Sequence, residues 1–523
     1  MQNATVLTDQ LDLAAKSITP KLLLDHISTL ASDEFEGRCP GTAGEALTLQ
    51  YFAAQIAAIS AETGVAFQIE QQTVATVEIA TKATMSVTIS GETQTLDAPR
   101  DYVAGSRRMQ AQVDVKDSDI IFLGYGITAP EYDWDDFKGV DVSGKTIVVL
   151  CGDPILPCSD NPDEVDTSMF RGKELTYYGR WIYKYEIGAR TKAAAVFIIH
   201  ETDRAGYGWD VVTHSFGHSD FELKSACPNE RPPIDGWLSL AAATKLFALA
   251  GLDLQKLKQA AASKDFVPVA LAAIATIKAD CTFKEMETQN FVAVLEGSDA
   301  NLKHECIVYA AHWDHFGIGA EGTISGAVDN ASGCAGVLAL AKAFASLPQR
   351  PPRSVVFFMP TLEERGLLGS RYYVSHPVLK MSDTMAVLNL EMLNLWGLGA
   401  NFSSVCKGHS SLDQLLTEAT ARQKRNVVPE SEPEKGYLYR SDHLPFMQAG
   451  VPALAIFFPC PDFMEQRRSY IKNDYHKVTD KVKSNWNLDG AAADTILMFD
   501  VGLRLLETGY RAKWNDMSEF RRL

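Results

Sequence analysis

Imidazole and carboxylate side chains recur directly after short apolar segments in the second half of the sequence. The apolar segments are typical of buried strands, and the side chains that follow them are His312, Asp314, Glu363, Glu364 and Glu391. Two further candidates lie in polar stretches, namely Asp329 in front of a helical pattern and His476 in the motif NDYH. One acidic residue after a strand would mean little, but this repetition indicates that several potential metal ligands meet at one site.

This donor set suits zinc, because zinc binds imidazole nitrogens and carboxylate oxygens and keeps one position open for water in catalytic sites. Five ligands suffice for two ions if one carboxylate bridges them: His312, Asp329, Glu364, Glu391 and His476. The carboxylates and a hydroxide would balance the charge of two Zn²⁺ ions, so the site could lie away from bulk water. Two ions about 3.5–4 Å apart can activate one water molecule and stabilise the oxygens of a transition state. The sequence therefore predicts a hydrolytic site with two zinc ions.

A mostly parallel sheet would bring these side chains together. From residue 306 onward, short apolar runs alternate with helical patterns, which is typical of α/β folds whose sheet is covered on both faces. The predicted strands are 306–311, 354–359, 384–390 and 453–458, and the predicted helices are 334–346, 366–374, 412–425 and 488–506. Sites in such sheets form beyond the carboxyl ends of the strands, which is where the candidate ligands lie.

The chain of 523 residues exceeds the size of one ordinary core and is expected to form more than one domain. Residues 93–281 differ in texture from the rest, with short β-rich runs and a long loop that contains several prolines. We therefore predict a catalytic domain formed by residues 1–92 and 282–523, with a β-rich domain of residues 93–281 inserted into it. In the first part of the catalytic domain we expect strands at 66–78 and 84–89.

The composition is that of a globular protein, with 46% hydrophobic and 22% charged residues. A net charge of −17 argues against a nucleic-acid partner, because little would neutralise the phosphates. No apolar run reaches the roughly 18 residues that cross a bilayer, so we expect no membrane span. Nine cysteines without a C-x-x-C motif argue against a zinc ribbon, and Cys151 with Cys158 is the pair that could form a disulfide in an exported protein.

Six motifs in one order resemble a known family: AHWDH, GAVDNASG, TLEERG, LNLEML, RSDHLPF and NDYHKVTD. They are similar to those of the zinc metallopeptidase family of bacterial leucyl aminopeptidases and glutamate carboxypeptidase. Segments 124–127 and 139–145 resemble the branch with an inserted protease-associated domain, and loop 36–42 matches the start of the family's domain. The resemblance implies the zinc exopeptidase fold. It also implies an aminopeptidase that acts on peptide substrates through a hydroxide that bridges two zinc ions.

The resemblance assigns a role to each candidate ligand. Asp329 would bridge both ions. Glu364 and His476 would complete the ligands of one ion. His312 and Glu391 would complete those of the other.

Three further carboxylates would act beside the ligands. Glu363 would be the general base that deprotonates the bridging water, with a pKa raised by its dry surroundings. Asp314 would orient His312 from behind, and Asp442 is expected to support the ligands in the same way.

A tyrosine usually stabilises the tetrahedral oxyanion in this family. The candidates are Tyr475, next to His476, and Tyr439, next to the RSDH turn, and we select Tyr475. The family also places a cis peptide bond after the bridging aspartate, which is Asp329–Asn330 in this sequence.

Glu391 departs from the family's pattern, which mostly has aspartate at this position. The longer side chain still reaches a metal ion, but it changes the position or the affinity of that ion. The related glutaminyl cyclases carry glutamate here and work with one zinc ion. Occupancy of the second zinc site is therefore left open by the sequence.

Other functions remain as alternatives to the aminopeptidase. A carboxypeptidase or dipeptidase would need an arginine cluster, and only Arg365 and Arg440 lie near the motifs. A glutaminyl cyclase-like enzyme would fit Glu391. A catalytically dead binding scaffold should have lost ligands, whereas all five positions hold competent ones.

The location in the cell follows only indirectly from the sequence. Residues 1–13 are polar and lack a basic start followed by an apolar stretch, so they are not a signal peptide. We expect a protein exported to the periplasm or secreted by a bacterium, with the cytoplasm as the alternative. The oligomeric state and the side-chain preference of the substrate are left open.

Overall fold

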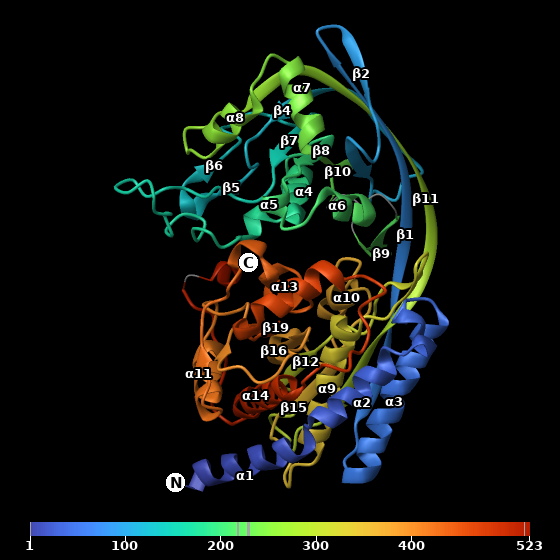
Figure 1. The fold of residues 1–523 in the computed structure, drawn as a ribbon, viewed down its shortest axis with the longest axis vertical. Helices are drawn as coiled ribbons and strands as arrows, with labels where there is room; N and C mark the ends of the chain where they lie inside the picture. The colour runs from blue at the N-terminus through green and yellow to red at the C-terminus, as the bar shows by residue number, and fades with distance from the viewer. Residues whose placement is uncertain (1, 217–218, 227–230, 517, 523) are drawn as a thin grey trace. The chain divides into compact units, whose positions relative to one another are not determined.

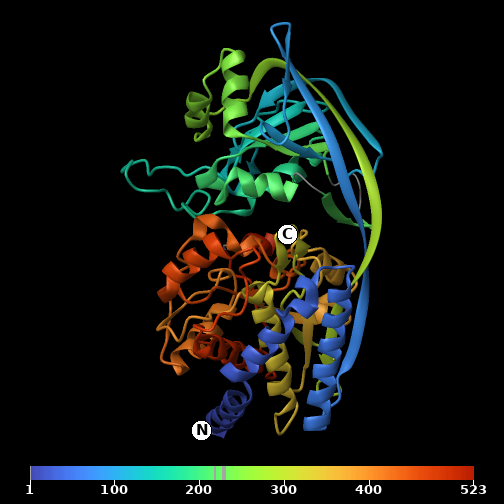
Figure 2. The same ribbon diagram turned by 45° about the vertical axis from the view of Figure 1, so that its right-hand side comes forward.

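The computed structural model describes residues 2–216, 219–226, 231–516 and 518–522 (Figure 1, Figure 2). The chain forms two compact units. Unit 1 comprises Met1–Val74, Glu287–Ser431 and Arg440–Leu523, and unit 2 comprises Ala75–Met286 and Glu432–Tyr439. The boundaries of the inserted domain that the sequence analysis placed at 92/93 and 281/282 stay a prediction.

A mostly parallel sheet forms the centre of unit 1. Its strands lie in the order β19 (Ala453–Phe457), β16 (Thr384–Glu391), β12 (Cys306–Ala310), β15 (Ser354–Met359) and β11 (Val269–Leu295). The first four strands run parallel, and the end of β11 pairs antiparallel with β15. Every residue of the four parallel strands is buried, as expected for strands that are covered on both faces.

Helices flank this sheet in two groups. One group contains α2 (Pro20–Leu30), α3 (Ala43–Thr63), α9 (Ser332–Ala345) and α14 (Asp489–Leu505), of which α9 and α14 contact the sheet. Both views show the blue helices α2 and α3 beside the olive α9, so distant parts of the sequence lie side by side (Figure 1, Figure 2). The other group contains α10 (Leu368–Ser375) and α12 (His443–Gln448), and α12 packs on β16 and β19. The predicted fold class of a mostly parallel mixed sheet between helices is thus confirmed.

Unit 2 contains a second set of parallel strands. These strands are β4 (Gln112–Phe122), β7 (Thr146–Leu150), β8 (Ala195–Ile199) and β10 (Ile234–Leu238). β3 (Tyr102–Gly105) pairs antiparallel with β10, and the first part of β11 pairs antiparallel with β4. The principal helices are α4 (Trp181–Arg190), α7 (Leu240–Leu249) and α8 (Leu254–Ala261). Its identity as a protease-associated domain stays a prediction.

The prediction of two separate strands at 66–78 and 84–89 was wrong. A single strand, β1 (Gln68–Ile89), runs through both segments. The small and polar residues between them look like a break in the sequence pattern. The strand continues there because it changes partner, from β9 (Ser219–Leu223) to β2 (Glu92–Leu96).

The structure also answers two smaller expectations. Cys151 and Cys158 form no disulfide, and burial raises the pKa of the Cys151 thiol to about 11. Cys227 lies outside the described residues. In the described ranges, no helix has the length and apolar character that a membrane crossing requires.

Candidate active site

The five predicted ligands meet beyond the carboxyl ends of the parallel strands in unit 1. His312 lies two residues after β12, Glu391 is the last residue of β16, and Glu364 follows β15 by five positions. Asp329 lies in the turn in front of α9, and His476 follows α13 (Met464–Asn473). His312, Asp329 and Glu391 are buried, whereas the side chain of His476 keeps 34% of its surface exposed.

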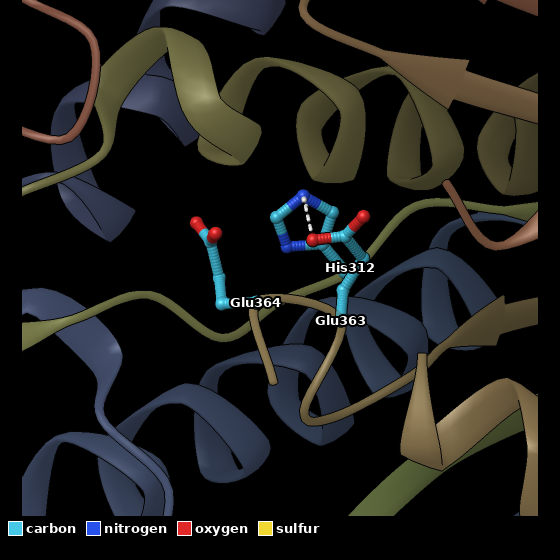
Figure 3. Close-up of side chains that lie close together, drawn as sticks. All are labelled: His312, Glu363 and Glu364. Atoms are coloured by element: carbon cyan, nitrogen blue, oxygen red, sulfur yellow. Dashed lines mark ion pairs between the residues drawn. The ribbon is translucent and has the colours of Figure 1, made fainter. Parts of the chain in front are cut away.

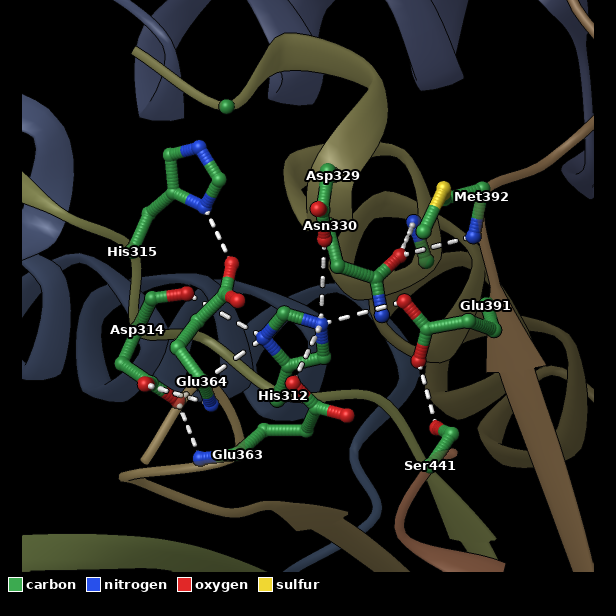
Figure 4. Close-up of polar contacts among 12 residues, drawn as sticks. His312, Asp314, His315, Asp329, Asn330, Glu363, Glu364, Glu391, Met392 and Ser441 are labelled. Atoms are coloured by element: carbon green, nitrogen blue, oxygen red, sulfur yellow. Dashed lines mark hydrogen bonds and ion pairs between the residues drawn. The ribbon is translucent and has the colours of Figure 1, made fainter. Parts of the chain in front are cut away.

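His312 faces two carboxylates. Its Nε2 atom lies 3.1 Å from Oε1 of Glu391 and 3.3 Å from Oδ1 of Asp329 (Figure 4). Burial alone would lower the pKa of His312, but the negative charges of Glu391 and Glu363 outweigh burial and raise this pKa well above its usual value. One nitrogen and two oxygens from three separate segments thus converge in the manner of metal ligands, all within 4.8 Å of one another.

His476 forms a second group with two carboxylates. Its Nε2 atom lies 3.2 Å from Oδ2 of Asp329 and 3.2 Å from Oε2 of Glu364. The other oxygen of Glu364, Oε1, lies 2.6 Å from Nδ1 of His315 (Figure 4). His315 therefore fixes the orientation of the Glu364 carboxylate, a contact that the sequence analysis did not predict.

Asp329 is common to both groups, because Oδ1 faces His312 and Oδ2 faces His476. Burial would raise the pKa of Asp329, but the two histidines hold it below its usual value. Asp480 holds the turn in place by accepting hydrogen bonds from the backbone N–H of Val328, at 3.0 Å, and of Asp329, at 3.3 Å. The peptide bond Asp329–Asn330 is cis, as the family resemblance implied.

Glu363 lies next to the two groups without completing either. Its Oε2 atom is 3.9 Å from Nε2 of His312, and its side chain is 11% exposed (Figure 3). Burial raises the pKa of Glu363 well above its usual value, and the charges of Glu391 and Glu364 raise it further against the opposing effect of His312. A carboxyl group with a raised pKa at the edge of a dry site is suited to proton transfer.

Asp314 supports the site through its carboxylate and its backbone. The carboxylate accepts hydrogen bonds from the backbone N–H of Glu363, at 3.0 Å, and of Glu364, at 3.4 Å (Figure 4). The Nδ1 atom of His312 lies closer to the main-chain oxygen of Asp314, at 3.1 Å, than to its carboxylate, at 3.7 Å. Asp314 thus orients the turn that carries Glu363 and Glu364 as well as the His312 ring.

Asp442 is fully buried in front of α12. It accepts a short hydrogen bond from the hydroxyl of Ser370, and burial raises its pKa to about 7. Asp442 follows Ser441, whose side chain contacts a predicted ligand directly.

Ser441 restrains Glu391. Its hydroxyl donates to Oε2 of Glu391 at 2.6 Å and accepts a hydrogen bond from Nδ2 of Asn389 at 2.8 Å. This contact leaves Oε1 of Glu391 directed at His312 (Figure 4). The sequence analysis did not select Ser441, and its place in the motif RSDHLPF was the available signal.

Ser441→Ala should lower zinc affinity by about 10- to 100-fold, the usual cost of losing a hydrogen-bond partner behind a metal ligand. Without the hydroxyl, Oε2 of Glu391 is released and the carboxylate can rotate. Competition with a chromophoric chelator measures this change. Ser404→Ala is the matched control, because Ser404 is also buried and donates to the main-chain oxygen of Ala455. Equal zinc affinity in Ser441→Ala and Ser404→Ala would contradict the restraint.

Tyr475 lies against the candidate ligand His476. The two rings stack with their centroids 3.7 Å apart, and burial raises the pKa of the Tyr475 hydroxyl well above its usual value. The phenol is therefore neutral over the physiological range and able to donate a hydrogen bond. The other candidate, Tyr439, belongs to unit 2, where its ring lies 5.9 Å from that of Tyr177.

The donors present fit zinc. The Nε2 atom of His476 is buried and makes no hydrogen bond within the described part of the chain, although two carboxylate oxygens lie 3.2 Å from it. A nitrogen that points between two oxygens without hydrogen-bond geometry is arranged as a ligand of a shared cation. The remaining donors are also imidazole and carboxylate groups, which zinc prefers together with thiolates.

Comparisons with known proteins agree with this geometry. Residues 290–500 match the model of peptidase family M28. The chain is 29% identical over 207 residues to the aminopeptidase YwaD of Bacillus subtilis, covering 38% of this chain and 41% of that protein. It is 30% identical over 169 residues to leupeptin-inactivating enzyme 1 of Streptomyces exfoliatus, covering 32% and 35%. The chain thus spans about two fifths of the length of the curated relatives that it matches.

A solved structure resembles the whole chain. The aminopeptidase from Aneurinibacillus sp. strain AM-1 superposes with a TM-score of 0.54 at 16% sequence identity. The superposition covers 94% of this chain and 95% of that one. This likeness supports the fold described above.

Proposed function

Because residues 290–500 form a peptidase family M28 domain, as the sequence motifs predicted, we propose that this chain is a zinc-dependent aminopeptidase. The enzyme would remove the N-terminal residue from peptides. The observation that carries the proposal is the meeting of two histidines and three carboxylates beside Glu363, at the carboxyl edge of the unit 1 sheet.

The proposed ligands divide into two sets that share Asp329. His312 and Glu391 would hold one ion, and Glu364 and His476 the other. Zinc bound there would polarise the scissile carbonyl and lower the pKa of the attacking water. Two ions are supported by the two oxygens of Asp329, which face different histidines.

The chain's own side chains would move the proton and stabilise charge. Oε2 of Glu363 would accept a proton from the attacking water and donate it to the leaving amine. The neutral hydroxyl of Tyr475 would donate a hydrogen bond to the oxyanion. The negative charge of Glu363, Glu364 and Glu391 would attract the free ammonium group of the substrate.

A pair of substrates tests the aminopeptidase assignment. We expect hydrolysis of leucine p-nitroanilide by the zinc-loaded protein and at least a hundredfold slower hydrolysis of its N-acetylated form, since acetylation removes the ammonium charge. Chelation should abolish the activity, and zinc should restore it. Equal rates on both substrates, or full activity after verified metal removal, would refute the proposal.

The same site supports one second candidate, a glutaminyl cyclase-like enzyme, because Glu391 stands where most relatives of this type have aspartate. A peptide with N-terminal glutamine distinguishes the two. Release of ammonia without release of free glutamine would favour the cyclase, whereas free glutamine would favour the aminopeptidase.

The family resemblance also supports two proposals about context. Residues 93–281 would form an inserted protease-associated domain, and the protein would be exported from a bacterial cell. Cell fractionation tests the second proposal, because an exported enzyme should be recovered in the periplasm or the medium.

A further inference from the structure

Arg38 lies beneath the candidate site with no exposed surface. It is the last residue of the short 3-10 helix Asp33–Arg38, in the loop between α2 and α3. Its guanidinium donates four hydrogen bonds, and all four acceptors are main-chain oxygens. The acceptors are Trp313 at 2.8 Å, Leu30 at 2.8 Å, Ser325 at 2.6 Å and Gly326 at 2.9 Å.

Three of these acceptors belong to the loops that carry candidate zinc ligands. Trp313 directly follows His312, and Ser325 and Gly326 precede Asp329 in the turn before α9. The main-chain oxygen of Arg38 also accepts a hydrogen bond from the N–H of His315, at 3.2 Å. One residue therefore joins the His312 loop to the Asp329 loop by contacts in both directions.

The geometry requires an arginine at this point. A guanidinium is planar, keeps its charge, and presents five N–H groups at fixed angles, whereas a lysine has its donors on a single atom. Carbonyls on three separate segments cannot be reached together from a single ammonium nitrogen. The neighbouring Gly37 makes the close approach possible, because a side chain there would lie 2.4 Å from the main-chain oxygen of Ile324 at a φ of +65°.

We propose that Arg38 is a positioning residue that sets the separation of His312 and Asp329 and thereby the affinity of the site for metal ions. The inference rests on the proposed function only in taking these two residues as metal ligands. Arg38 touches neither ligand side chain in the hydrogen bonds described, so its effect would pass through the backbone of the two loops.

Cobalt titration of the chelated, metal-free protein tests the inference. Co²⁺ binds sites of this type and reports their geometry through its visible absorption. Arg38→Lys should lower Co²⁺ affinity by about 10- to 100-fold and change the intensity and position of the visible bands. Arg38→Ala should show a larger loss of affinity, partly restored by millimolar methylguanidinium.

Arg353→Lys is the matched control. Arg353 is also buried, and it donates to the main-chain oxygen of Glu507 and, at 2.6 Å, to the carboxylate of Glu305. It precedes β15, so it lies at the amino end of the parallel strands and away from the candidate ligands. We expect Arg353→Lys to keep the Co²⁺ affinity and spectrum of the unmodified protein, even where it lowers the melting temperature.

Each outcome separates this inference from the proposed function. Unchanged affinity and spectrum in a folded Arg38→Lys protein would overturn the positioning role, as would equal losses in Arg38→Lys and Arg353→Lys. Absence of Co²⁺ binding by the unmodified protein would also overturn it. Selective loss of Co²⁺ affinity in Arg38→Lys would support the inference even if no peptide were hydrolysed, in which case only the proposed function would fail. Arg38→Lys decides the matter if Arg38→Ala does not fold.

Discussion

Glu363→Gln should lower kcat by about a hundred- to ten-thousand-fold and leave the zinc content unchanged, since positioned proton transfer contributes that much to catalysis. The amide has nearly the shape of the carboxyl group but cannot accept a proton from water. Glu363 stands apart from the ligand groups, with Oε2 3.9 Å from the nearest atom of His312. Its removal therefore affects proton transfer and not metal binding. Steady-state kinetics and metal analysis on the same preparation measure both effects.

Glu364→Gln is the informative comparison, because it is the same change one residue along the chain. Oε2 of Glu364 lies 3.2 Å from Nε2 of His476, so this variant should lose zinc affinity as well as activity. Glu321→Gln, an exposed position in the same unit, should change neither. Loss of zinc from Glu363→Gln would make Glu363 a ligand and contradict its role as the base.

The candidate ligands could be predicted from the sequence because their chemistry and their place in the fold are both local signals. His312, Glu364 and Glu391 each follow a fully buried strand, and such strands appear in the sequence as unbroken apolar runs. Once the strands are taken as parallel, their carboxyl ends must lie along one edge. The convergence of ligands from different strands then follows without knowledge of any contact.

The supporting contacts could not be predicted in the same way. Arg38 bonds to residues 275 and 288 positions away, and Ser441 to Glu391 across 50 positions. Most of these bonds involve main-chain oxygens or a hydroxyl, which every segment of a chain offers. Residue type therefore gives no hint of the partner, and only the folded backbone selects it.

Two long elements were also absent from the prediction, for different reasons. β11 alternates buried and exposed residues along its first part, but its buried positions are largely alanine, which gives weak contrast with the exposed ones and low strand propensity. α1 (Gln2–Ser17) contacts α9 and α14, but its polar sequence has no strong apolar stripe. Both elements are specified by packing partners more than by local pattern.

Asp329→Asn should remove the metal and the activity together. Oδ1 of Asp329 lies 3.3 Å from Nε2 of His312, and Oδ2 lies 3.2 Å from Nε2 of His476, so both proposed ion positions depend on this one carboxylate. Asparagine offers one neutral oxygen and an NH₂ group that cannot bind a cation. The loss of zinc affinity should therefore exceed the 10- to 100-fold cost of losing a residue behind a ligand. Metal analysis after dialysis against a weak chelator measures it.

The melting temperature gives an independent readout of the same change. In the unmodified protein, zinc binds the folded state and should raise the melting temperature, and a chelator should lower it again. In Asp329→Asn the melting temperature should no longer respond to zinc or to the chelator. Asp500→Asn is the control for loss of a buried carboxylate, because Asp500 pairs with Arg422 at 2.7 Å in the same unit and contacts no candidate ligand in the described hydrogen bonds. It should lower stability and keep the response to zinc. A normal zinc response in Asp329→Asn would show that Asp329 is not shared between two ions, and the two-ion arrangement would then have to be abandoned.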